Sequence, residues 1–155
     1  MVFDTETIST TKPFCYNLGY IVVDFEKGEP LAIEDLVIEQ IYKNKPLFET
    51  AYYSEKKPAY TSKMKGKTMT MKKFGYACMK MRNDIRKYGI THVYAFNSPF
   101  DNRVMNFNCD FFKVKNPLNE VEIRDIRAYA MNSLCNSSDY KYFCEKHELF
   151  TESYN

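Results

Sequence analysis

Short apolar runs separated by turn residues occupy the first part of the chain, and they predict β-strands. Val2-Phe3-Asp4 is typical of the end of a very short strand, and residues 17–25 form a longer apolar run rich in Ile and Val. A turn sequence follows at 26–30, and residues 31–42 alternate in part between apolar and polar positions. We therefore expect residues 31–42 to pair back on residues 17–25 as a hairpin.

Residues 43–70 show no clean hydrophobic period and contain prolines, tyrosines and lysines. We expect a surface excursion here, with a short helix around 47–53. Irregular segments of this length in a compact domain are usually functional or disordered.

The clearest helix covers residues 71–88, where apolar residues recur at helical spacing and Lys and Arg lie outside the apolar stripe. The stripe consists of Phe74, Cys78, Met81 and Ile85. We expect Gly89 to end this helix. Residues 91–96 predict a strand, and Ser98 is the expected N-cap of a second helix.

A strand at 121–126 and helices at 127–134 and 138–149 complete the expected elements. A hairpin followed by alternating helices and strands predicts an α/β fold with a mixed β-sheet and helices on both faces. The sheet is expected to be antiparallel at its N-terminal hairpin and parallel afterwards, because parallel crossovers need an intervening helix. Ligands of such sheets bind at the carboxyl ends of the strands, where Asp4 and Asn97 are expected.

The length of 155 residues suits one domain. No apolar run is long enough to cross a membrane and no N-terminal secretory signal is visible, so we expect a cytoplasmic protein with no membrane partner. The five cysteines show no C-x-x-C spacing and there are two histidines, which argues against a zinc site. We expect reduced thiols, several of them in the core.

Charge is distributed unevenly along the chain. Residues 56–87, here called the basic segment, contain eleven Lys or Arg and one acidic residue, a net charge of +10. Because the whole chain carries +2, the remainder carries −8. A basic segment on an acidic body suits a protein that holds a polyanion near carboxylates. An ordinary lysine-rich surface is the alternative.

Asp4 and Glu6 form the first candidate site. Residues i and i+2 of an extended segment face the same side, so these carboxylates project together where the first strand ends. Two such groups repel each other unless a cation or water separates them. Mg²⁺ and Mn²⁺ prefer oxygen ligands of this kind, although many strand ends carry two solvated acids.

Asp101 belongs to the second candidate site, the sequence Asn-Ser-Pro-Phe-Asp at 97–101. This sequence follows the strand that we expect beside the first one. The Asp101 carboxylate can cap its own helix, because the N-terminal amides and the helix dipole favour an anion. Beside Asp4 and Glu6, the same carboxylate can also bind a metal ion.

Together these motifs resemble those of the DEDD (DnaQ-like) 3′–5′ exonuclease superfamily, which has a ribonuclease H-like fold. The sequence Phe-Asp-Thr-Glu-Thr at 3–7 resembles the first motif of the superfamily, and Ala-Phe-Asn-Ser-Pro-Phe-Asp at 95–101 resembles the second. Arg124-Asp125-Ile126 is similar to the superfamily's next strand, where an Asp is common but not catalytic. The motif and element order agrees over residues 1–149, and the size and composition fit a phage or prophage nuclease.

The resemblance implies hydrolysis of phosphodiester bonds by a two-metal mechanism with Mg²⁺ or Mn²⁺. It implies that the metal ligands and catalytic residues are Asp4, Glu6 and Asp101. The implied substrate is the 3′ end of a single-stranded nucleic acid, with tyrosines near the basic segment stacking on bases and its lysines holding phosphates. The expected substrate-binding residues are Thr5, Thr7, Asn97, Phe100, Lys63, Lys65 and Lys67.

The superfamily places a fourth carboxylate on a late helix, as His-x4-Asp or Tyr-x3-Asp, and this motif is not found here. The nearest match is His147 followed by Glu152, which makes His147 a candidate catalytic residue; an exposed histidine at a helix end is the alternative. We expect residues 1–155 to form a single exonuclease-like domain that lacks its C-terminal helix and is poorly active alone.

The sequence therefore predicts a 3′–5′ exonuclease for single strands, with DNA favoured over RNA. One alternative is a degenerate member of the same fold that binds nucleic acid without cutting it. Another is a structural protein whose carboxylates and lysines are merely solvated. The oligomeric state is not fixed by the sequence.

Overall fold

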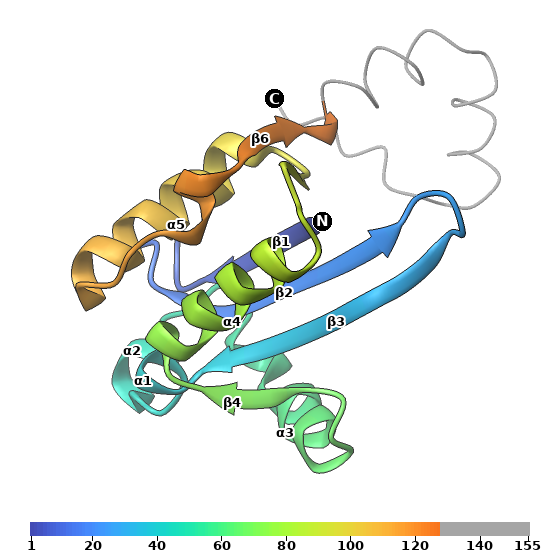
Figure 1. Ribbon diagram of the computed structural model, residues 1–155. Coiled ribbons are helices and arrows are strands. Elements are labelled where there is room, and N and C mark those ends of the chain that lie inside the picture. The colour runs from blue at the N-terminus through green and yellow to red at the C-terminus, as the bar shows by residue number, and fades with distance from the viewer. Residues whose placement is uncertain (128–155) are drawn as a thin grey trace, which may run out of the picture.

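The structure is a computed structural model that describes residues 1–127, and the helices expected after residue 127 lie outside the described residues. A six-stranded mixed sheet forms its centre (Figure 1). The strands are β1 (Val2–Thr7), β2 (Cys15–Asp24), β3 (Glu29–Ile38), β4 (Thr70–Lys72), β5 (His92–Ala95) and β6 (Glu122–Asp125). The helices are α1 (Glu39–Tyr42), α2 (Lys45–Phe48), α3 (Lys57–Lys65), α4 (Phe74–Lys87) and α5 (Ser98–Phe112), with 3₁₀ turns η1 (Ser54–Lys56) and η2 (Pro117–Glu120).

The strands lie in the order β4-β3-β2-β1-β5-β6. β2 and β3 form the predicted antiparallel hairpin, and β1 pairs antiparallel with the other edge of β2. β5 runs parallel to β1, and β6 runs parallel to β5. The predicted α/β class and mixed sheet are therefore confirmed, and β5 is the predicted neighbour of β1.

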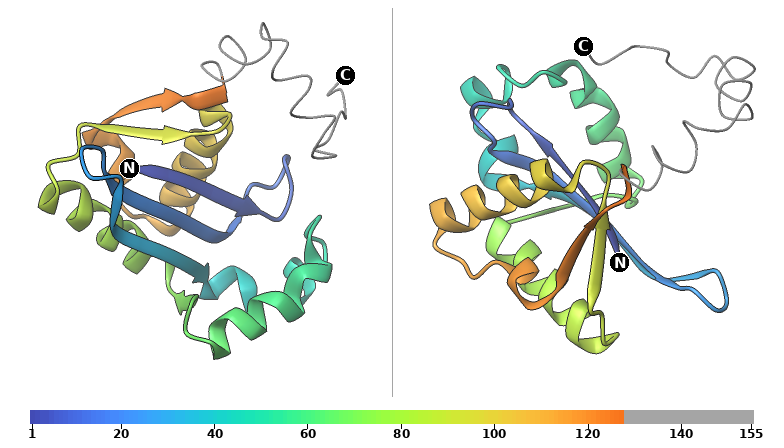
Figure 2. Two further views of the ribbon diagram at one scale, coloured as in Figure 1. Left: turned by 90° about the vertical axis from the view of Figure 1, so that its right-hand side faces the viewer. Right: turned by 90° about the horizontal axis from the view of Figure 1, so that it is seen from above.

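Helices lie on both sides of the sheet (Figure 2). α4 and α5 cover one face, where Tyr20 of β2 donates a hydrogen bond from its hydroxyl to Asp84 of α4. α3 lies over one end of the other face, where its Lys63 lines a pocket with Asp4 and Glu6 of β1. Alternation along β1 therefore sends neighbouring side chains to opposite helical layers.

The apolar stripe predicted for α4 is confirmed. Phe74, Cys78, Met81 and Ile85 are all buried, and they pack in one core with residues of β2 and α5 such as Leu18 and Val104. Burying a side chain the size of Phe or Met removes apolar surface worth about 2 to 3 kcal/mol from water. Gly89 follows this helix with a φ of 58°, a conformation that glycine adopts without strain.

Several predicted boundaries are wrong. The strand predicted over 31–42 ends at Ile38, because residues 39–42 form helix α1 with Ile41 and Tyr42 buried. The excursion at 43–70 holds helix α3 as well as the short helix, which lies earlier than predicted. The helix predicted from residue 71 begins at Phe74, since residues 70–72 pair with β3 as strand β4.

Two further predictions concern the described residues in part. Cys15, Cys78 and Cys109 are free and buried, as expected of reduced core thiols. Within residues 1–127, no helix is both long and apolar enough to span a membrane.

Candidate functional site

The carboxyl end of β1 is where the sheet divides. β1 pairs with β5 at Val2, opposite Tyr94, whereas its ladder with β2 continues to Thr7. Beside Thr5, the first turns of α5 take the position that a neighbouring strand would occupy. Such a division between strands is a common ligand-binding position in α/β sheets.

Asp101 fills this position and joins the two sequence motifs. Its Oδ1 atom accepts a hydrogen bond from the Thr5 main-chain amide at 3.0 Å and another from the Thr5 hydroxyl at 2.6 Å. The side chain thus satisfies an edge amide of β1 that no strand reaches. This contact spans 96 residues of sequence, and it places the second motif directly against the first.

The burial of Asp101 makes its charge costly. The pKa of Asp101 is raised to about 6, mainly by burial and partly by the nearby negative charge of Asp4, while the hydrogen bonds from Thr5 act in the opposite direction. Only 2% of the residue is exposed. A carboxylate in this setting gains when a cation neutralises it.

Asp4 and Glu6 project to the face opposite Thr5. Partial desolvation raises the pKa of Asp4. Desolvation also raises the pKa of Glu6, where the charge of Asp4 raises it and that of Lys56 lowers it. The two carboxylates therefore repel each other, as predicted. Asp101 bonds to the Thr5 side chain on the other face of β1, although the charge of Asp4 still raises its pKa.

A pocket of about 230 Å³ opens over Asp4 and Glu6. Asp4 lies opposite Gly19 in β2, which in turn lies opposite Asp35 in β3, so no side chain separates the two aspartates. Asn17, the partner of Glu6 in the ladder, donates from Nδ2 to Oδ1 of Asp35 at 2.7 Å. The sheet therefore presents a polar and acidic floor.

The opposite wall of this pocket is basic. Lys56, at the end of η1, and Lys63, on α3, line it together with Tyr60. Lys63 is thus placed as predicted, at the carboxylates, and the basic segment meets the acidic body at this point. Lys65 and Lys67 are exposed and do not line this pocket.

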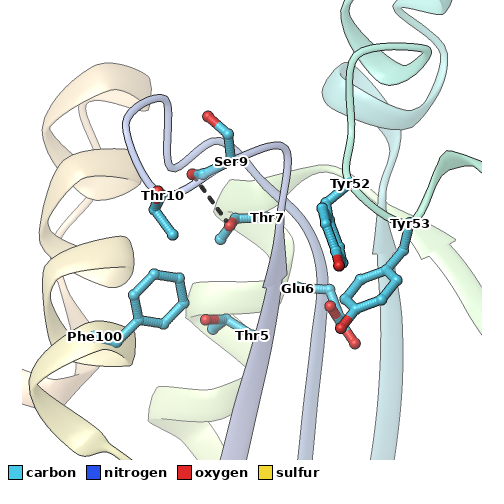
Figure 3. A pocket seen from close by; sticks show the side chains of 8 residues that line it. All are labelled: Thr5, Glu6, Thr7, Ser9, Thr10, Tyr52, Tyr53 and Phe100. Carbon is cyan, nitrogen blue, oxygen red and sulfur yellow. Dashed lines mark hydrogen bonds between the residues drawn. The ribbon is translucent and has the colours of Figure 1, made fainter. Parts of the chain in front are cut away.

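A second pocket of about 340 Å³ lies at the carboxyl end of β1 (Figure 3). It brings together four residues that the sequence predicted for the site, and adds hydroxyl groups and two tyrosines. The lining residues are Thr5, Glu6, Thr7, Ser9, Thr10, Tyr52, Tyr53 and Phe100. Glu6 lines both pockets, so they meet at this residue.

Asn97 and Ser98 are placed differently from the prediction. Asn97 is the N-cap of α5, with a left-handed φ of 63°, and Ser98 is the first residue of the helix. The main-chain amide of Asn97 donates to Oδ1 of Asp125 at 3.0 Å, and the same oxygen accepts from the Arg127 amide at 2.8 Å. Asp125 therefore holds the turn before α5. Asn97 does not line either pocket.

The donor chemistry of the carboxylates suits a hard divalent cation, since all the donors are oxygen atoms with raised pKa values. Within residues 1–127, however, no group of three or more His, Cys, Asp or Glu side chains is arranged to hold a metal ion. The carboxylates of Asp4, Glu6 and Asp101 are therefore not gathered into one ion site in this structure. His147 lies outside the described residues.

Sequence reasoning missed Asp35 and Asn17, and it included Lys56 in the basic segment without placing it at the carboxylates. The register across Gly19 brings Asp35 to Asp4, and a one-residue shift of β3 would turn Asp35 to the other face. No local signal in the sequence reports this register. Gly19, in the middle of an apolar strand, is the one sequence feature that indicates a position on the sheet with no side chain above it.

Comparison with known proteins gave no match to any family model, curated protein or solved structure. The function is therefore inferred from the residues and geometry of these two pockets.

Proposed function

We propose that this protein is a metal-dependent 3′–5′ exonuclease that hydrolyses phosphodiester bonds at the end of a single-stranded nucleic acid, with DNA favoured. We assign it to the DEDD type with a ribonuclease H-like fold. One observation carries the proposal: Asp101 contacts Thr5, between Asp4 and Glu6, so that two separate motifs meet at the carboxyl end of β1.

The residues divide into acidic and basic roles. Asp4, Glu6 and Asp101 form the proposed acidic centre, and burial is the main cause of the raised pKa of each. Lys56, at the end of η1, and Lys63, on α3, line the pocket over Asp4 and Glu6. There they can hold the phosphates of a bound strand. The lysines therefore bring a polyanion to a surface that would otherwise repel it.

Mg²⁺ or Mn²⁺ bound by Asp4, Glu6 and Asp101 would supply an activated water and stabilise the leaving oxygen. The chain's own contribution is to hold these carboxylates and to orient the strand. Thr5 fixes Asp101 by two hydrogen bonds, so Thr5 acts as a positioning residue.

The test uses the full 155-residue chain with Mn²⁺ and a 5′-labelled single-stranded DNA. We expect a ladder of products shortened from the 3′ end, formed slowly because the fourth carboxylate motif of the superfamily is not found in these residues. Asp4→Asn and Asp101→Asn should each lower the rate at least 100-fold, because each removes a charge that a cation needs. Asp110→Asn is the matched control, since Asp110 is an exposed aspartate on the same helix as Asp101.

Equal rates for Asp101→Asn and Asp110→Asn would contradict the proposal. A second candidate function is nucleic-acid binding without cleavage by a degenerate domain of this fold. The observation in its favour is that the described residues hold no ready ion-binding group. DNA binding by the wild type, with no products at any Mn²⁺ concentration, would establish that function instead.

A further inference from the structure

Two buried thiols contact each other between the helices that cover one face of the sheet. Cys78 lies on α4 and Cys109 lies on α5, and their Sγ atoms are 3.9 Å apart, close enough for one thiol to donate a weak hydrogen bond to the other. The exposed fractions of the two residues are 1% and 4%. The helices pack side by side here, since the ring centroids of Phe74 and Phe112 lie 5.2 Å apart (Figure 2). Helix packing therefore holds together two thiols that are 31 residues apart in sequence.

Arg82 brings a positive charge to this pair from α4, one turn after Cys78. Its guanidinium group donates to the main-chain carbonyl oxygen of Lys115, and the Glu120 carboxylate lies 3.5 Å from its Nε atom. This Nε atom is buried and has no hydrogen-bond partner among the described residues. The Arg82 charge also reaches Cys109 and favours the thiolate form of that residue.

The two thiols differ in how readily they ionise. A hydrogen bond from Cys78 lowers the pKa of Cys109, and Arg82 lowers it as well, whereas burial and the charge of Asp110 raise it. The contact with Cys109, together with burial, raises the pKa of Cys78. Because the thiolate is the reactive form of cysteine, Cys109 is the nucleophile of the pair and Cys78 is its neighbouring thiol.

Cys15 shows how an unreactive buried thiol looks in the same core. It is fully buried, and its thiol donates to the carbonyl oxygen of Asn17 at 3.1 Å. Burial raises the pKa of Cys15. Such a thiol packs as a small apolar group. Cys109 is nearly as buried, so its contacts with Cys78 and Arg82 are what set it apart.

We propose that Cys78 and Cys109 form a redox modification site, which a small hydroperoxide such as hydrogen peroxide converts into a disulfide. The oxidant has to be small, because only 4% of Cys109 is exposed. The Sγ atoms have to close from 3.9 Å to about 2.05 Å, and no strand or helix lies between them.

The reaction has two steps. The Cys109 thiolate first attacks one oxygen of the peroxide, so the O–O bond breaks, and Cys109 becomes a sulfenic acid. The hydroxide that leaves becomes water with the proton that Cys109 lost on ionising. Cys78 then attacks the Cys109 sulfur, and the sulfenic oxygen leaves as water with the Cys78 proton. Two thiols and one peroxide thus give one disulfide and two water molecules.

The disulfide would join α4 to α5, the helix whose first turn carries Asp101. It would close a loop that contains β5 and most of α5, and such a loop restricts the unfolded chain. Neither cysteine lines a pocket of the candidate site, so this inference does not depend on the proposed function.

The test uses the full chain in which Cys135 and Cys144, which lie outside the described residues, are changed to Ser. We expect hydrogen peroxide to give a disulfide between Cys78 and Cys109, identified by peptide mass spectrometry and reversed by dithiothreitol, while Cys15 stays a thiol. The melting temperature should rise by about 5 to 10 °C on oxidation.

Single substitutions in the same chain separate the two steps. In Cys78→Ala, we expect Cys109 to stop at the sulfenic acid, which dimedone traps. In Cys109→Ala, Cys78 should remain a thiol. Cys15→Ala is the matched control for loss of a buried thiol, and it should form the disulfide at the rate of the parent chain.

Arg82→Gln should slow the oxidation of Cys109 severalfold, because it removes the charge that favours the thiolate. Arg86→Gln is the matched control, since Arg86 lies one turn further along α4 and its ion pair is with Glu120. Equal oxidation rates for these two variants would remove Arg82 from the site.

Three results would overturn the inference. Oxidation of Cys15 as fast as that of Cys109 would show that peroxide reacts with the unfolded chain. Absence of trapped sulfenic acid in Cys78→Ala would show that Cys109 is not the nucleophile. A lower melting temperature for the disulfide form would show that the packing of α4 on α5 does not accommodate the bond.

Discussion

Asp84 on α4 and Asp101 on α5 lie on helices that cover the same face of the sheet, and their exposed fractions are 5% and 2%. Asp84 accepts hydrogen bonds from Lys80 at 2.6 Å and from the Tyr20 hydroxyl at 2.8 Å, and Lys80 also contacts Glu34 at 2.9 Å. The fold thus supplies a cation to one buried aspartate.

Asp101 receives no such compensation. Among the residues that the structure describes, no Lys or Arg forms an ion pair with Asp101, and the nearby Asp4 adds a second negative charge. A buried charge without a partner is destabilising, so its retention favours a functional role over a structural one. The comparison therefore separates a carboxylate that the fold pairs with a cation from one that has no cationic partner among the described residues.

The largest expected effect is on the pH dependence of stability in metal-free buffer. The pKa of Asp101 is raised from 3.8 to about 6 by burial, so the folded chain binds this proton more tightly than the unfolded chain does. Between pH 4 and 6 the folded state holds more protons, and the free energy of unfolding therefore falls as pH rises through this window. The fall amounts to at most about 3 kcal/mol, at about 1.4 kcal/mol for each pKa unit.

Urea unfolding of the wild type and of Asp101→Asn at several pH values measures this effect. The difference between the two curves cancels the contributions of exposed carboxylates such as Glu120, whose pKa is lowered by Arg86 and Lys115. We expect the variant to lose the fall between pH 4 and 6. Parallel curves for the two proteins would show that folding does not raise the pKa of Asp101.

A smaller effect, opposite in sign for the two aspartates, is expected at pH 7. Asp84→Asn should lower the free energy of unfolding by about 2 kcal/mol, because it breaks a buried ion pair whose Lys80 partner is partly exposed. Asp101→Asn should raise it by about 1 kcal/mol, since the amide oxygen still accepts from Thr5 while the uncompensated charge is gone. Denaturant midpoints compare the stability of the two variants with that of the wild type. A lower free energy of unfolding for both variants would contradict the distinction between the two aspartates.

The contrast between the two aspartates was only partly predictable. Local patterns sufficed for α4 and for the acidic pair, because helical spacing and strand alternation are properties of neighbouring residues. The hairpin and the place of β5 beside β1 also followed from element order. These features bring Asp101 near Asp4, which is why the motifs alone indicated one site.

The rest depends on contacts between distant segments. Strand β4 is only three residues long, and its pairing with Leu36 and Val37 is what makes it a strand. The link from Thr5 to Asp101 exists because β5 leaves the edge of β1 uncovered, and local sequence does not report where a ladder stops. The same limit applies to Asp35, whose place is set by register.

The smallest expected effect concerns the basic segment and separates lysines that line the acidic pocket from lysines that do not. Lys56 and Lys63 line it, whereas Lys65 and Lys67 lie outside. Each lysine that contacts a phosphate contributes about one unit to the slope of log affinity against log salt concentration. Changing Lys56 and Lys63 to Gln should therefore reduce that slope by about two and weaken binding severalfold. The paired change of Lys65 and Lys67 to Gln is the charge-matched control and should alter the slope little. Fluorescence anisotropy of a labelled single strand at increasing salt measures the slope for each double variant. Equal slopes for the two double variants would mean that the charge of the basic segment matters and that its position against the carboxylates does not.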